Sequence, residues 1–233
     1  MIVLGIETAT QICAVALARD GQLLCEYRSN LKNAHAQIIA GSIEKILQDS
    51  QLTAQQLDGI AVSIGPGSFT GLRIGLATAK GIAFAVNCPI AAVPTLEALA
   101  QQAPVEEGLI CPLIRSRASE VYAALYQRRH GQILLMKDVT VLSITDLPSF
   151  TSQDALLIGA LPRPNPEHPL PQGFRWAREE FAILSGLSIA RMGTDRLRHG
   201  QIEDVVLLEP RYLQDFTAGK PKLAVWEKDH HAG

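Results

Sequence analysis

Short apolar runs separated by turn residues open the chain, and apolar positions then recur at helical spacing. The apolar runs predict strands, and Asp20-Gly21 between two of them is a typical hairpin turn. Over 34–48 the apolar residues fall on one side of a helix, which predicts an amphipathic helix with Asn33 as its N-cap. The predicted strands of this opening are residues 2–8, 12–18 and 22–28.

The pattern then alternates between strands and helices. Thr53 and Gln56 have the spacing of a capping box, which predicts a short helix after residue 53. A three-stranded meander followed by alternating units is the order of the ribonuclease-H-like fold, which underlies the actin and sugar-kinase (ASKHA) superfamily. We therefore expect an α/β fold of this actin-like class, which by itself says little about activity. The further predicted elements are strands 59–64 and 89–93 and helices 73–86 and 95–103.

The second half of the chain is less regular. Helical spacing returns over 176–192 after a stretch rich in proline. Prolines 162, 164, 166, 169 and 171 predict a loop at 161–173 that cannot join the interior of a sheet. The strands predicted before it are 108–115, 120–127, 132–142 and 154–160.

Length and composition suit two subdomains. The chain has 233 residues, of which 47% are hydrophobic, and this is enough to bury a sizeable core. Pro104 and Gly108 bracket a short acidic link and mark a boundary. We expect subdomains at 1–104 and 105–220, followed by a frayed tail at 221–233.

Charge is nearly balanced, with 21 Lys and Arg against 23 Asp and Glu. This balance excludes a protein that grips nucleic acid by a uniformly basic surface. One segment does lean basic, through Arg115, Arg117, Arg128 and Arg129. It fits either the solvated face of a hairpin or a direct contact with RNA, and the first interpretation is favoured.

The sequence predicts a cytoplasmic protein. Its start enters a strand pattern directly, so no secretory signal is expected. No run of 18 residues is free of polar breaks, so no membrane span is expected. The four cysteines form no CxxC pair, which favours reduced thiols.

The stretch GPGSFTG, residues 65–71, has the composition of a phosphate-binding loop without its pattern. N–H groups at the start of the following helix could hold an anion. However, Leu72-Arg73 stands where a P-loop needs Lys followed by Ser or Thr. A bound phosphate and a structural turn both remain open, and the spacing favours the turn. The loop residues are Gly65, Pro66, Gly67, Ser68, Thr70 and Gly71.

The helix predicted over 73–86 is apolar on nearly every side. A helix that is apolar all round is expected to be buried all round. One face should pack on the sheet, and the other should meet either a partner chain or the second subdomain of this chain. The small residues form two ladders on roughly opposite sides, Gly75-Ala79-Ala83 and Ala77-Gly81-Ala85.

Five segments are more specific than this general pattern. They are GIETAT at 5–10, GPGSFTGLRIGLATAKG at 65–81, VPTLEALA at 93–100, SEVYAALY at 119–126 and EPRYL at 209–213. Together they closely resemble the bacterial TsaB family, also called YeaZ, over essentially the whole chain. The resemblance implies an actin-like protein that acts in forming threonylcarbamoyladenosine in tRNA.

The resemblance also implies a subunit without chemistry of its own. In this family a paralogue, TsaD, transfers the threonylcarbamoyl group to tRNA, and an ATPase, TsaE, joins the assembly. ATP and metal are expected on those partner subunits, no cofactor is expected in this chain, and tRNA is expected to bind the complex. The resemblance implies contact with TsaD, or with a second copy of the chain, through helices 34–48 and 73–86. The interface residues carried over are His35, Ile39, Ile43, Arg73, Gly75, Leu76, Ala79 and Ala83.

The residues themselves separately favour an absence of chemistry. None of the six histidines is spaced by four, as the metal-binding HxxxH helix of catalytic relatives requires. Ala9 stands where nucleotide-binding relatives use a glycine. The alternative function is an ATP-binding phosphotransferase of the same superfamily. Two positions depart from the family pattern, because Glu7 replaces its common Asp and Arg115-Ser116-Arg117 replaces its common D-A-R.

Overall fold

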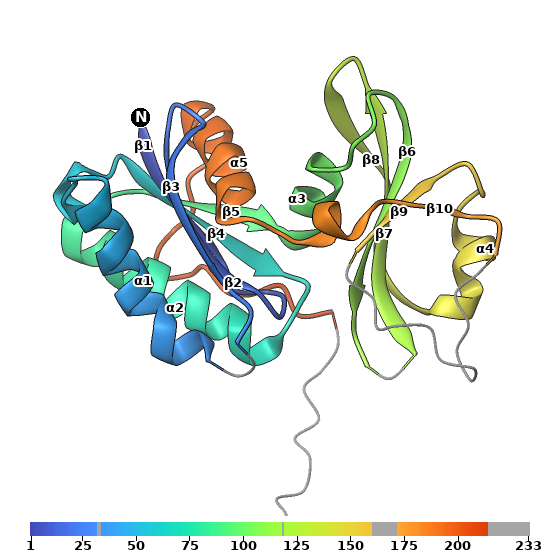
Figure 1. Ribbon diagram of the computed structural model, residues 1–233, viewed down its shortest axis with the longest axis horizontal. Helices are drawn as coiled ribbons and strands as arrows, with labels where there is room; N and C mark the ends of the chain where they lie inside the picture. The colour runs from blue at the N-terminus through green and yellow to red at the C-terminus, as the bar shows by residue number, and fades with distance from the viewer. Residues whose placement is uncertain (32–33, 118, 160–171, 214–233) are drawn as a thin grey trace, which may run out of the picture.

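Two five-stranded sheets, each in its own subdomain, organise the chain (Figure 1). The computed structural model describes residues 1–31, 34–117, 119–159 and 172–213. Two sequence-based predictions lie wholly or largely outside these residues: the proline-rich loop at 161–173 and the tail at 221–233. The prediction of Asn33 as an N-cap is wrong, because α1 begins at His35 and its N-cap is Ala34, which makes no side-chain cap bond.

The first sheet has the predicted meander and alternating units. Its strand order is β3-β2-β1-β4-β5, in which β1, β4 and β5 pair in parallel, β2 pairs antiparallel with β1, and β3 pairs antiparallel with β2. This mixed sheet is that of the actin-like class. The strands are β1 (Ile2–Glu7), β2 (Cys13–Arg19), β3 (Gln22–Ser29), β4 (Gly59–Gly65) and β5 (Ile90–Pro94).

Helices cover both faces of the first sheet. Helices α1 (His35–Asp49) and α2 (Phe69–Val86) lie on one face, and α5 (Gly186–Arg198) lies on the other (Figure 1). Side chains alternate along β1, so that Leu4 packs with α1 and α2 whereas Val3 packs with α5. The predicted capping box is confirmed, because the Thr53 N–H donates to Gln56 Oε1 at 2.8 Å at the start of a short 3₁₀ helix.

The second sheet has the strand order β10-β9-β6-β7-β8. Helix α3 (Thr95–Gln101) packs on its face toward the first sheet, and the single turn α4 (Leu147–Phe150) packs on the other face. The strands are β6 (Gly108–Arg115), β7 (Glu120–Arg129), β8 (Gln132–Ser143), β9 (Leu156–Ile158) and β10 (Arg175–Trp176).

The helix predicted over 176–192 is wrong in its first half. The chain there forms β10 and a 3₁₀ turn at Glu179–Ala182, and α5 begins only at Gly186. The boundary is set by Ser185, whose Oγ accepts the Ser188 N–H at 2.9 Å as an N-cap. Similarly, the strand predicted over 154–160 shortens to β9.

The predicted division into 1–104 and 105–220 is also wrong in part, because the chain returns to the first sheet at α5. The approach is so close that a Cβ on Gly5 would lie 2.2 Å from the Gly186 carbonyl oxygen. The segment after α5 stays there, since the Glu203 and Arg211 N–H groups donate to Ile90 O at 2.9 Å and Ile64 O at 2.8 Å. Residues 186–213 therefore belong to the first subdomain.

Candidate functional site

The glycine loop after β4 leads directly into α2. The helix begins at Phe69, so Thr70 and Gly71 lie in its first turn and not before it as predicted. Ser68 is the N-cap, and its Oγ accepts the Gly71 N–H at 3.2 Å. One of the free N–H groups that an anion would need is therefore already bonded within the chain.

The same loop packs against the loop between β1 and β2. The Ser68 N–H donates to Ala9 O at 2.7 Å. A Cβ on Gly67 would lie 2.3 Å from Ala9 O, and one on Gly71 would lie 2.0 Å from Thr8 O. Glycine is required here because two stretches of backbone touch, and a phosphate has no room between them.

A buried carboxyl group occupies the N–H groups of the β1–β2 loop. Glu7 Oε1 accepts the N–H groups of Ala9 at 2.8 Å and Thr10 at 3.1 Å. Burial raises the pKa of Glu7 to about 7, against the smaller opposing effect of these hydrogen bonds. Nucleotide-binding proteins use such N–H groups to hold phosphate. Here the chain supplies its own acid group. The residue pattern indicated the importance of Ala9 in this loop but did not predict this role of Glu7.

The outward side of α2 is apolar and open to solvent. Phe84 is 86% exposed, and Ala77, Gly81 and Ala85 are exposed beside it. An added Cβ on Gly81 would meet nothing within 4 Å. An outward helix face is normally polar, so this one is unusual. The alternative that the chain's own second subdomain covers this side of the helix is wrong, and burial by a partner chain stays a prediction.

Six of the eight predicted interface residues are buried within the chain and cannot form its outer surface. Of the two small-residue ladders on α2, the one that contains Gly75 faces the sheet. A Cβ on Gly75 would lie 2.1 Å from Thr8 Oγ1, so the fold requires glycine there. The buried residues are Ile39, Ile43, Gly75, Leu76, Ala79 and Ala83.

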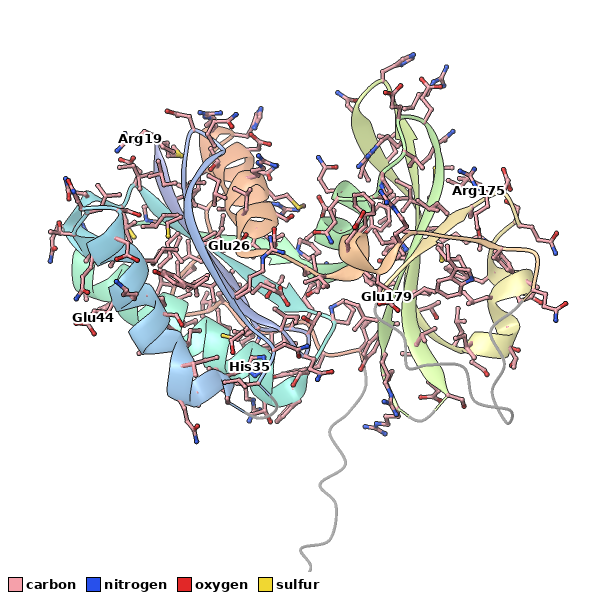
Figure 2. The ribbon with its side chains drawn as sticks, in the orientation of Figure 1. Arg19, Glu26, His35, Glu44, Arg175 and Glu179 are labelled. Carbon is pink, nitrogen blue, oxygen red and sulfur yellow. The ribbon has the colours of Figure 1, made fainter. Side chains whose placement is uncertain are left out.

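The other two predicted interface residues, His35 and Arg73, lie nearer the surface. His35 is half-buried at the start of α1, where its Nε2 lies 3.2 Å from Thr10 O (Figure 2). Arg73 is exposed and stacks on Phe69 at 4.0 Å from the ring centroid. Figure 2 also shows Glu44 on the outer side of α1, well away from His35.

The segment after α5 adds a part of this surface that the hydrophobic pattern did not predict. It runs beside α2, since Lys80 Nζ donates to Val206 O at 3.1 Å. Val206 is 83% exposed and Leu207 is 74% exposed. The sequence signal that could have pointed here is the nearby EPRYL segment, which was used only as a family motif.

A cavity of about 400 Å³ opens where β4 and β5 end. Ligands of open α/β sheets commonly bind beyond the carboxyl ends of the strands. The lining mixes both charges, so it offers no uniform site for a polyphosphate. The charged lining residues are Arg196, Arg211, Glu203, Asp204 and Glu209.

The basic segment does not form one surface. Arg115 pairs with Val121 at one end of the β6–β7 hairpin, and Arg128 pairs with Gly108 at the other, roughly 20 Å away along the strand. Arg128 is also committed within the fold, because it donates to backbone oxygens of Ala100 and its neighbours at the end of α3. The direct RNA contact through all four arginines loses its geometric basis.

Metal and membrane sites can be described only for the residues that the structure covers. Among these, no three His, Cys, Asp or Glu side chains converge as metal ligands. Helix α2 is long and apolar enough, by length and composition alone, to cross a membrane, although here its inner side packs on the sheet. The expectations of no metal site and no membrane span stay predictions.

Comparisons with known proteins give a TsaD family model and curated TsaB relatives. The family model of TsaD, tRNA N6-adenosine threonylcarbamoyltransferase, matches residues 23–218. The tRNA threonylcarbamoyladenosine biosynthesis protein TsaB of Bacillus subtilis is 37% identical over 131 residues, which are 56% of this chain and 57% of that protein. TsaB of Escherichia coli K12 is 38% identical over 135 residues, 57% of this chain and 58% of that protein. The chain thus spans little more than half the length of these curated relatives.

Solved structures support the same grouping. YeaZ from Pseudomonas aeruginosa superimposes with a TM-score of 0.77 at 25% identity, covering 91% of this chain and 99% of that one. An activator of 2-hydroxyisocaproyl-CoA dehydratase from Clostridium difficile superimposes with a TM-score of 0.50 at 8% identity, covering 86% and 97%. The second likeness concerns the fold alone.

Proposed function

The chain belongs to the TsaB (YeaZ) family, and from this premise we propose that it is a non-catalytic subunit in the formation of threonylcarbamoyladenosine in tRNA. It binds a catalytic paralogue of the TsaD type and positions it, and an ATPase of the TsaE type joins the assembly. ATP, metal and tRNA are held by the assembly through its other subunits.

The apolar outward side of α2 is the observation that carries this proposal. Exposed apolar surface on one helix disfavours a free monomer, because burying it is worth about 25 cal/mol per Å². The exposed residues Ala77 and Gly81 allow another backbone to approach closely, and Phe84 supplies an aromatic anchor. This side of the helix suits a protein partner.

The glycine loop supports the non-catalytic part of the proposal. Glu7 takes two N–H groups of the β1–β2 loop, and Ser68 takes one at the start of α2. A nucleotide phosphate would have to displace these internal bonds, and an ionised Glu7 would repel it.

The test is association with a TsaD-type paralogue, measured by light scattering and calorimetry. We expect a one-to-one complex with wild-type chain and at least tenfold weaker binding with Phe84→Glu. The matched control is Leu135→Glu, which changes another exposed apolar side chain, on β8, and should bind like wild type.

The activity of the assembly is tested separately with tRNA. Threonylcarbamoyl transfer should require both proteins, and the isolated chain should give none. Transfer by the isolated chain would show that the subunit is catalytic and that this part of the proposal is wrong.

An ATP-binding phosphotransferase is the alternative. The position of the cavity beyond the ends of β4 and β5 favours it, whereas the mixed charge of the lining does not. Equilibrium dialysis of the isolated chain with ATP separates the two functions. Micromolar binding supports the alternative, whereas no binding supports the non-catalytic subunit.

A further inference from the structure

The segment that follows α5 is fixed along the first subdomain although much of it is exposed. Its two ends are bonded to neighbouring strands, through Glu203 to β5 and Arg211 to β4. Between them, Val205 packs against the core and Leu208 is buried. The segment is therefore an ordered strap, defined here as residues 203–213.

Side chains from α2 hold the strap in place. Lys80 Nζ bonds to Val206 O, and Arg73 Nε donates to Tyr212 Oη at 2.9 Å. The Phe69 and Tyr212 rings lie 5.0 Å apart, and the Arg73 guanidinium stacks on Phe69. These contacts join α2 and the strap into one continuous surface.

The strap presents two apolar side chains to solvent in a fixed geometry. Asp204 Oδ1 accepts the N–H groups of Val206 at 2.7 Å and Leu207 at 3.2 Å, which fixes the turn. Val206 and Leu207 are, with Phe84, the most exposed large hydrophobic residues among those that the structure describes. Because the strap is already ordered in the free chain, little further conformational entropy is lost when a partner binds it.

We propose that the strap is the second half of the docking surface and that Val206 and Leu207 contact the same partner as Phe84. This inference rests on the proposed function, since it names a further part of the surface used there. The occupant is a different protein chain with an apolar docking face and a carboxylate opposite Arg73.

The charges of α2 favour a different chain over a second copy that packs helix against helix. Helix α2 has no Asp or Glu, and Arg73 and Lys80 are its charged residues. Two copies apposed through α2 bring like charges together, which costs affinity. Among the described residues no acceptor pairs with the two Nη groups of Arg73, so they remain available for a bidentate carboxylate.

The test replaces both strap residues in the full chain, Val206→Asp with Leu207→Asp. Binding to the TsaD-type paralogue should weaken at least tenfold, with an unchanged thermal melt because both side chains are exposed. The matched control is Leu134→Asp with Leu135→Asp on β8, which should bind like wild type. In a third variant, Arg73→Gln, binding should weaken and lose much of its dependence on salt.

The outcomes distinguish a failure of this inference from a failure of the proposed function on which it rests. Wild-type binding by the strap variant, together with weak binding by Phe84→Glu, overturns the inference and leaves the proposed function standing. No complex with wild-type chain overturns the proposed function. If the strap variant instead abolishes only self-association, or only binding to anionic phosphatidylserine vesicles, the inferred occupant is wrong.

Discussion

At the residue scale, the Glu7 carboxyl group occupies the N–H groups of the β1–β2 loop. The carboxyl group is buried, its Oε1 accepts two N–H groups, and its Oε2 has no partner among the described residues. Burial disfavours the charged form more than the hydrogen bonds favour it, so the pKa rises from 4.5 to about 7. The group therefore titrates near neutral pH in the folded chain.

This titration predicts a pH dependence of stability. A carboxyl with a raised pKa binds its proton more tightly when folded, so its contribution is complete below about pH 4.5 and is lost as the pH rises to about 7. The loss is about 3 kcal/mol at about 1.4 kcal/mol per pH unit. Urea unfolding from about pH 5 to about pH 8 should show this slope in wild type and in the exposed-site control Glu44→Gln. The slope should be absent in Glu7→Gln, and an equal slope in all three chains would contradict the burial argument.

Replacing either of two α2 glycines with alanine should change the free energy of unfolding, in opposite directions at the two positions. Gly75→Ala places a Cβ 2.1 Å from Thr8 Oγ1 and should lower the free energy of unfolding by about 1–3 kcal/mol. Gly81→Ala meets nothing within 4 Å and should raise it by about 1 kcal/mol through helix propensity. Chemical denaturation of the isolated chain measures both, and a destabilised Gly81→Ala would mean that this helix face is not open.

At the scale of elements, Arg128 ties β7 to the end of α3, the helix that leads from the first sheet into the second. From β7 it donates to four backbone oxygens around the end of α3, at distances from 2.6 to 3.1 Å. A cation bonded to the free carbonyls at a helix C-terminus is stabilising. Close by, Gln102 Nε2 bonds to Ile183 O, where the chain returns to the first sheet. The two chain segments that connect the sheets, one after α3 and one before α5, are thus held together by hydrogen bonds at one place.

Removing this cap should therefore cost stability. Arg128→Ala leaves the α3 carbonyls without their donor, and we expect a loss of about 2 kcal/mol in thermal unfolding. Arg129→Ala removes the neighbouring exposed guanidinium and should change stability by less than about 0.5 kcal/mol. Equal effects of the two substitutions would mean that the four bonds contribute nothing beyond surface charge.

At the scale of the whole molecule, the loops where a nucleotide would bind are filled, and the exposed apolar surface lies elsewhere, on α2 and the strap. The loops at the ends of β1 and β4 are filled by their own side chains and backbone, whereas α2 and the strap expose apolar groups. The binding experiments with Phe84→Glu and with the strap variant belong to this scale. They test whether the partner binds the exposed surface of α2 and the strap.

Local pattern predicted most of the elements because strands and helices are set by nearby residues. Alternation and turn residues gave β1 to β8 to within about two residues. The start of α5 was missed because its boundary depends on the Ser185 cap and on contact with β1, which periodicity does not report. For the same reason α5 was assigned to the wrong subdomain.

The sequence by itself determined the fold class, the family likeness and the presence of one unusually apolar helix, because these depend on residue type and spacing. Only the tertiary structure decided which side of α2 faces water, since both of its small-residue ladders are equally apolar and the choice depends on Thr8 fitting against Gly75. It alone brought the segment with Val206 and Leu207 beside α2, because residues more than a hundred positions apart meet only through packing on a common sheet.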